Sequence, residues 1–225
     1  MKRILFLLLL ALSFLTAKAQ TTHQTGYWTR LFIRVKLDDK WSLQAEADNR
    51  RLTEPDRPLQ FISHIHLHRK FGKTFETAVG LTFSTVWQGS LAVPEWRPFE
   101  EFYVFQPLGK GFRLSHRLRT EQRWTHNFSN GELTDGFNFR WRFRYRPQLD
   151  WRISEKWALK LNDELMFHDD GFDQNRLFIG AERKLPHGFS IELGYLKLIQ
   201  KRTVGYFDRD NLRLTVYKDM DFSGK

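Results

Sequence analysis

Residues 137–146 alternate strictly between aromatic and polar, mostly basic, side chains. One parity consists of Phe137, Phe139, Trp141, Phe143 and Tyr145, and the other of Arg140, Arg142, Arg144 and Arg146. In a β-strand successive side chains point to opposite faces, whereas a helix would mix both kinds on every face. The pattern therefore predicts a strand with one apolar face and one basic face. A membrane-spanning barrel would place the apolar face in lipid and the basic face in its lumen, whereas a soluble sandwich would place the apolar face in its core.

The same alternation recurs along the chain. In residues 27–37, for example, Leu31, Ile33 and Val35 oppose Arg30, Arg34 and Lys36. The pattern predicts strands at about 27–37, 41–51, 59–70, 75–87, 98–106, 112–125, 137–146, 156–167, 175–185, 189–199 and 211–222. Their lengths suit the ~9–11 residues of a tilted membrane-spanning strand.

The connections between these strands alternate in length. Short turns are expected at 38–40, 71–73, 108–110, 154–155 and 186–188, and longer polar loops at 52–58, 88–97, 126–136, 168–174 and 200–210. Such an alternation is typical of all-β, antiparallel transmembrane barrels with short periplasmic turns and longer extracellular loops. Because bacterial barrels have even strand numbers, we expect about 12 strands, with one hidden near 21–27, or alternatively about 10.

The N-terminus has the features of a cleaved secretory signal. Lys2 and Arg3 precede the apolar run 4–15, and Ala17-Lys18-Ala19 supplies small residues at a cleavage site. We therefore expect a signal peptide at 1–19 and a single barrel domain at 20–225. The chain has no cysteine, so cross-linking does not stabilise the exported protein.

Charge and hydropathy narrow the expected environment. The formal net charge is +10, and the mean hydropathy of −0.53 is uninformative because each lipid-facing residue is averaged with a lumen-facing one. Phe222 lies near the C-terminus on the apolar parity of the last strand, like the terminal signal read by the outer-membrane assembly machinery. We expect an outer-membrane location, with outer-membrane lipids and the barrel-assembly machinery as partners and no nucleic acid; the sequence leaves the oligomeric state open.

Several segments resemble a known family. They are Gln20 after the signal, 41–46 (Trp-Ser-Leu-Gln-Ala-Glu), 117–124 (Arg-Leu-Arg-Thr-Glu-Gln-Arg-Trp), 139–149 and 173–180 (Asp-Gln-Asn-Arg-Leu-Phe-Ile-Gly). They are similar to an uncharacterised barrel family of Bacteroidetes-type bacteria, the domain of unknown function family 2490. The resemblance covers nearly the whole mature chain. It implies an outer-membrane location and supplies no activity.

The polar parity predicts what the lumen contains. The residues expected to face it are Arg117, Arg119, Glu121, Arg123, Arg140, Arg142, Arg144, Arg146, Lys160 and Glu164. A mostly basic interior favours anions, but a barrel of this size is narrow. Cross-strand pairing with acids such as Glu46, Glu182 and Glu192 would plug it. The sequence therefore leaves open a plugged structural barrel and a small anion-preferring pore.

An enzymatic alternative rests on His126 and Ser129. Outer-membrane phospholipase barrels use a histidine as the base and a serine as the nucleophile for attack on a lipid ester. In those enzymes the two residues are two positions apart on a strand. Here the spacing of three turns the side chains to opposite faces of a strand, and an Asn-Ser-Asn-Gly turn is the simpler interpretation of the segment.

The sequence predicts neither a cofactor nor a metal site. His64, His66 and His68 share one strand face, but successive same-face residues lie about 7 Å apart, too far for all three to bind one ion. Asp169, Asp170 and Asp173 lack the spacing of a calcium loop. A last alternative is a soluble periplasmic β-protein that binds an acidic ligand on its basic face. Its core would have to enclose most of the 21 phenylalanines.

Overall fold

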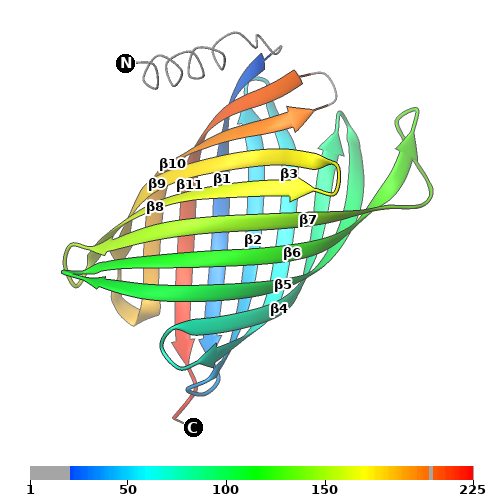
Figure 1. Cartoon of the computed structure of the whole chain (residues 1–225). Coiled ribbons are helices and arrows are strands. Elements are labelled where there is room, and N and C mark those ends of the chain that lie inside the picture. Colours follow the sequence, from blue (N-terminus) through cyan, green and yellow to red (C-terminus); the bar gives the residue numbers. More distant parts are fainter. Residues whose placement is uncertain (1–20, 203–204, 225) are drawn as a thin grey trace, which may run out of the picture.

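The structure, a computed structural model, describes residues 21–202 and 205–224, and strands make up almost all of this part of the chain (Figure 1). The expected signal peptide lies outside the described residues. The strands are β1 (Thr21–Lys36), β2 (Trp41–Thr53), β3 (Asp56–Phe71), β4 (Phe75–Gln88), β5 (Leu91–Gly109), β6 (Phe112–Ser129), β7 (Glu132–Arg152), β8 (Trp157–His168), β9 (Gly171–Lys184), β10 (Phe189–Arg202) and β11 (Gly205–Asp221), with one 3₁₀ turn, η1 (Pro186–Gly188). Among the described residues, none of the helices has the length and apolar character of a membrane span.

The strands form one closed barrel. Each strand pairs antiparallel with its sequence neighbours, and β1 pairs with β11 in parallel, from Thr21 opposite Tyr206 to Lys36 opposite Asp221. The described residues contain eleven strands, because the segment 21–27 is the first half of β1 rather than a separate strand. When an odd number of strands alternate in direction, the first and last strands run in the same direction, so the closing pair is parallel.

The segments expected as longer loops are mostly strand. Only two residues separate the end of β4 at Gln88 from the start of β5 at Leu91, and β6 and β7 are joined by Asn130-Gly131. Both of these residues have positive φ, 52° and 81°, as a two-residue type I′ hairpin turn requires. Figure 1 shows the β6–β7 hairpin projecting past its neighbours. Both ends of the described barrel therefore have tight turns, and the strands at one end extend beyond the expected bounds.

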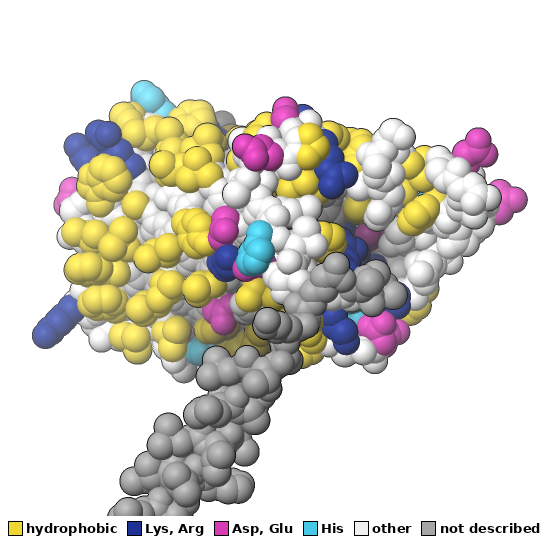
Figure 2. Space-filling model, turned by 90° about the horizontal axis from the view of Figure 1, so that it is seen from above, with side chains coloured by type: hydrophobic (Ala, Val, Ile, Leu, Met, Phe, Trp, Pro, Cys, Tyr) yellow, Lys and Arg dark blue, Asp and Glu magenta, His cyan; other side chains and the backbone are white. Residues whose placement is uncertain are grey.

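The outer face of the barrel is apolar. The aromatic parity of β7 points outward, and its rings at positions 137, 139, 141, 143 and 145 are 38–51% exposed. Arg142 is buried on the opposite face. Figure 2 shows one side of the molecule, on which hydrophobic side chains gather with few charged groups among them. This distribution is the reverse of a soluble protein, in which the large apolar side chains face inward.

Aromatic rings on the inner face lie flat over glycines of neighbouring strands. Phe178 of β9 lies over Gly180 and Gly194, and the Arg213 guanidinium carbon is 3.4 Å from the centre of its ring. Phe99 of β5 lies over Gly80 in the same way. The missing side chains leave room for each ring against the wall, so these rings narrow the lumen less than rings standing upright would.

The glycine beneath Phe178 gives a stability prediction. We expect Gly194→Ala to lower the free energy of unfolding by about 1–3 kcal/mol, because a Cβ there would overlap the ring of Phe178 and the carbonyl oxygen of Ile179. Denaturant unfolding in detergent measures the change. Gly224→Ala is the matched control, since no atom lies within 4 Å of its Cβ position. If the ring causes the clash, Phe178→Leu restores part of the loss in the double variant; equal stability of wild type and Gly194→Ala would contradict the prediction.

Candidate functional site

A large cavity occupies the barrel interior. Its volume is about 1780 Å³, and its lining includes Asp38 and Gly111 from one end of the barrel and Gln88 and Asp170 from the other. Basic side chains in the lining outnumber acidic ones by about two to one. The interior is therefore polar, positively charged and partly hollow.

The structure places nine of the ten expected lumen residues in the lining of this cavity. They are Arg117, Arg119, Arg123, Arg140, Arg142, Arg144, Arg146, Lys160 and Glu164. The tenth, Glu121, also points inward, but it is fully buried behind guanidinium groups. Arg140 lies at the edge of the cavity, where it pairs with Asp170 at 3.1 Å and both side chains are about half exposed.

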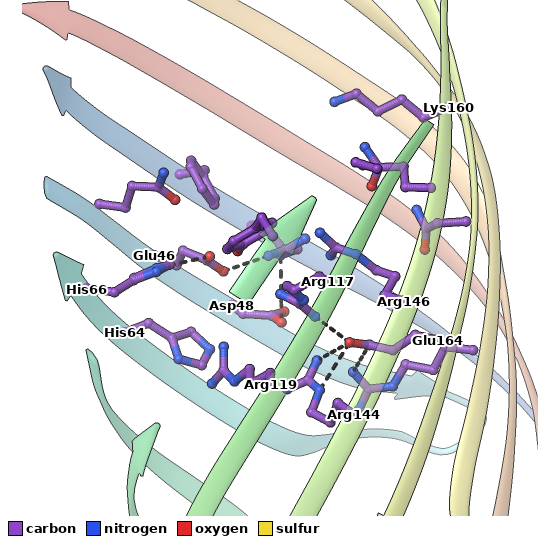
Figure 3. Close-up of a pocket in the computed structure, with 18 of the residues that line it drawn as sticks. Glu46, Asp48, His64, His66, Arg117, Arg119, Arg144, Arg146, Lys160 and Glu164 are labelled. Carbon is purple, nitrogen blue, oxygen red and sulfur yellow. Dashed lines mark hydrogen bonds and ion pairs between the residues drawn. The ribbon is translucent and has the colours of Figure 1, made fainter. Parts of the chain in front are cut away.

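Six charged groups form a closed circuit in the wall, which we call the ion-pair ring. Going around it, the members are Glu101, Arg117, Glu164, Arg144, Glu121 and Arg119, and Arg119 returns to Glu101. The N–O distances include 3.0 Å for Arg117–Glu101 and 2.7 Å for both Arg144–Glu164 and Arg144–Glu121. Figure 3 shows Arg117, Arg144 and Glu164 pointing toward one another.

The ion-pair ring depends on strand register. Arg117, Arg119 and Glu121 follow one another on the inner parity of β6, opposite Arg144 of β7. Glu101 of β5 and Glu164 of β8 complete it from either side. Each carboxylate thus accepts from at least two guanidinium groups, an arrangement in which the remaining lone pairs of buried charges are satisfied.

Two acids of β5 were missed by the sequence analysis. Glu101 lies in the expected strand 98–106, where Glu100-Glu101 and Phe102-Tyr103 interrupt the alternation. Glu95 lies in the segment 88–97, which was expected as a loop. Glu95 accepts hydrogen bonds from Arg123 at 2.7 and 2.9 Å and also binds Arg97. The inner parity of β5, read through Glu95, Phe99 and Glu101, was the available signal.

A second cluster surrounds Glu192 of β10. Its carboxylate accepts from Lys160 at 2.8 Å, from Arg213 at 2.9 Å and from the hydroxyl of Tyr217 at 3.1 Å. Lys160 also pairs with Glu182. Glu182 and Glu192 thus pair across strands with an expected lumen residue, Lys160. Glu46 also pairs across strands, but with Arg30 of β1, at 2.6 Å.

Some arginines that line the cavity have no carboxylate partner in the part of the chain that the structure describes. Within the described residues, none lies within ion-pair distance of Arg34, Arg146, Arg202 or Arg209, although all four line the cavity. Arg209 donates to the amide oxygen of Gln24 at 2.7 Å, and the buried Nε of Arg146 makes no hydrogen bond there. These guanidinium groups can bind anions without first breaking an ion pair.

The structure shows no contact between His126 and Ser129, the candidate residues of the enzymatic alternative. His126 packs edge-to-face against Phe137 on the outer parity at 5.0 Å between ring centres, and its Nδ1 lies 3.1 Å from the carbonyl oxygen of Asn127. Ser129 is the last residue of β6, next to the hairpin turn. The described residues show no hydrogen bond between His126 and Ser129, so this geometry does not favour a base and nucleophile pair.

Phe222 follows directly after β11. Its side chain is 42% exposed, and its backbone N–H donates to the carbonyl oxygen of Lys36 at 3.0 Å. An aromatic side chain thus stands at the edge of the closing strand pair, where the assembly signal was expected.

Comparison with known proteins identifies the family to which the chain belongs. None of the curated proteins matches the chain. The family model described as a protein of unknown function (DUF2490) matches residues 25–209, which run from β1 into β11. The chain, a closed barrel with an apolar outer face and a basic interior, therefore belongs to the DUF2490 family.

Proposed function

We propose that the protein is an integral outer-membrane β-barrel whose lumen admits small anions. The observation that carries this proposal is the combination of an apolar outer face with a basic cavity lined from both ends of the barrel. In a bilayer every backbone polar group must be paired internally, and a closed barrel meets this requirement because it has no free edge. The signal sequence expected at the N-terminus supports export.

The lumen favours small solutes. The ion-pair ring and the clusters around Glu95 and Glu192 occupy part of the interior, as expected for a barrel between the filled eight-stranded and the open sixteen-stranded sizes. Cations without carboxylate partners remain along the cavity, and they attract anions through direct hydrogen bonds and through the electric field of their positive charges. We therefore infer an anion preference and a low conductance.

Replacing unpaired cations should change ion preference. We expect the double variant Arg146→Gln, Arg209→Gln to shift the reversal potential toward zero in a salt gradient across a planar bilayer, because two binding charges leave the lumen while the ion-pair ring stays intact. Arg51→Gln, which removes an outward-facing cation paired with Asp56, is the matched control and should leave selectivity unchanged. The same reversal potential in the double variant would contradict the role of these arginines.

Location is tested separately from conductance. A barrel of this kind should leave the outer-membrane fraction only with detergent and should run at different gel mobilities before and after boiling. Release with the periplasmic contents would instead support a soluble β-protein that binds an acidic ligand. A detergent-extracted but silent barrel would place the anion in a closed binding cavity rather than in a pore.

A further inference from the structure

Two histidines and a glutamate meet on the inner wall next to the ion-pair ring. His66 and His68 lie on β3, and Glu101 lies on β5. Strand β4 separates them, but it presents Gly80 opposite His66 and Ala78 opposite both His68 and Glu101. Because these two residues are small, side chains from β3 and β5 can meet over β4.

The distances among the three side chains suit a transition metal ion. One nitrogen of each ring and one carboxylate oxygen all lie within 4.8 Å of one another. Nε2 of His68 is 2.9 Å from Nδ1 of His66, which is 3.7 Å from Oε2 of Glu101. Tetrahedral ligands about 2.1 Å from a zinc ion are about 3.4 Å apart. The observed distances lie on either side of that value.

The outer partners of these residues are those of metal ligands. Nδ1 of His68 is hydrogen-bonded to a carboxylate oxygen of Glu76 at 2.7 Å, whereas Nε2 of His66 lies 3.4 Å from one of Glu46 without a hydrogen bond. A carboxylate on the far nitrogen fixes the tautomer and orientation of a metal-bound imidazole. The hydroxyl of Tyr103 donates to Oε2 of Glu101 at 2.8 Å.

The basic neighbours of Glu101 leave one of its oxygens available. Arg117 and Arg119 both bind Oε1, at 3.0 and 3.3 Å, whereas Oε2 faces His66. His66, His68 and Tyr103 line the cavity, so an ion can enter through the lumen and a water molecule or an anion can take a fourth position. Two imidazoles and one carboxylate are ligands typical of zinc and its neighbours, and calcium and magnesium prefer oxygen alone.

We propose that His66, His68 and Glu101 bind one divalent transition metal ion of the zinc class within the lumen. Binding replaces the hydrogen bond between the two rings and releases the proton that it holds. The proposal departs from the sequence-based expectation, which considered three histidines of one strand. His64 takes no part, because its Nδ1 lies 2.6 Å from the hydroxyl of Thr82. The site does not depend on whether the barrel conducts ions.

Metal titration of the full, detergent-folded chain tests the site. Zn²⁺ competition against a chromophoric chelator should give one site per barrel, and Co²⁺ should show the visible absorption of a four-coordinate ion. We expect His66→Gln and His68→Gln to abolish this site. Glu76→Gln should weaken it about 10–100-fold, and His64→Gln, the matched control on the same strand face, should leave it unchanged. Gel mobility before boiling establishes that each variant is folded.

Several outcomes would overturn the proposal. They are no stoichiometric Zn²⁺ binding by the folded wild type, equal binding in His66→Gln or His68→Gln, and equal loss in His64→Gln. If the His66 and His68 variants do not fold, X-ray absorption of the zinc-loaded wild type decides the question. Two imidazoles and one carboxylate around zinc would support the site, and a single imidazole or oxygen ligands alone would refute it.

Discussion

Glu121→Ala is expected to lower the free energy of unfolding by about 3–5 kcal/mol, the range for removing one partner of a buried ion pair. The side chain is fully buried, and its two oxygens bind Arg142 at 2.6 Å, Arg144 at 2.7 Å and Arg119 at 2.7 Å. Each guanidinium group retains one other acidic neighbour, but the three positive charges would then face one another without the carboxylate between them. The loss arises from uncompensated buried charge rather than from the volume removed.

Denaturant unfolding in detergent measures this loss. Glu100→Ala is the matched control, because Glu100 is an exposed residue on the outer face of β5 whose hydrogen bonds among the described residues are to Thr120 and Gln122 and not to an arginine. Its replacement should cost no more than about 1 kcal/mol. The cavity gives a further test, since anions that reach the three arginines should restore part of the stability of Glu121→Ala and leave the control unchanged. A loss below about 1 kcal/mol in Glu121→Ala would mean that the ion-pair ring contributes little.

The members of the ion-pair ring differ in how far the sequence predicts them. Alternation alone predicts that Arg117, Arg119, Glu121, Arg144 and Glu164 face the lumen, because a period of two fixes the face of every residue within a strand. Their partners depend on register between strands, which one strand's pattern does not contain. Glu101 is the clearest case, because neighbouring glutamates and aromatics on β5 hid its parity.

The differences between the predicted and the observed fold have similar causes. The loop expected at 88–97 contains Pro94, yet β5 runs through both Pro94 and Pro98. The pairing of β5 with β6 is interrupted between Trp96 and Phe99, where the missing N–H of Pro98 removes a ladder bond. The parallel closure of β1 on β11 joins residues at the two ends of the chain. No local pattern reports such a pair, so strand number was inferred from a general rule.

Alternation predicts well which residues lie on the outer face. A charge introduced on this face should therefore cause a second large loss of stability. We expect Leu193→Arg to lower the free energy of unfolding in lipid vesicles by about 2–4 kcal/mol, the cost of an arginine on the lipid face near the bilayer centre. Leu193 of β10 is 51% exposed and lies opposite Leu214 and Ala181 on the same face, with Ile191 and Tyr195 on either side. The expectation rests on the proposed membrane location, because in water the same substitution would place a charge on an exposed surface at little cost.

A matched control separates the two environments. Leu133→Arg introduces the same charge at a position 42% exposed, on the β6–β7 hairpin close to its turn, where we expect water or headgroups and a change within about 0.5 kcal/mol. Tryptophan fluorescence during denaturant unfolding from vesicles gives both values. Equal and small losses in the two variants would show that the apolar face does not contact hydrocarbon and would favour the soluble alternative. A selective loss in Leu193→Arg would locate the hydrocarbon boundary between these two positions, and moving the arginine residue by residue along the outer parity of β10 would then trace it.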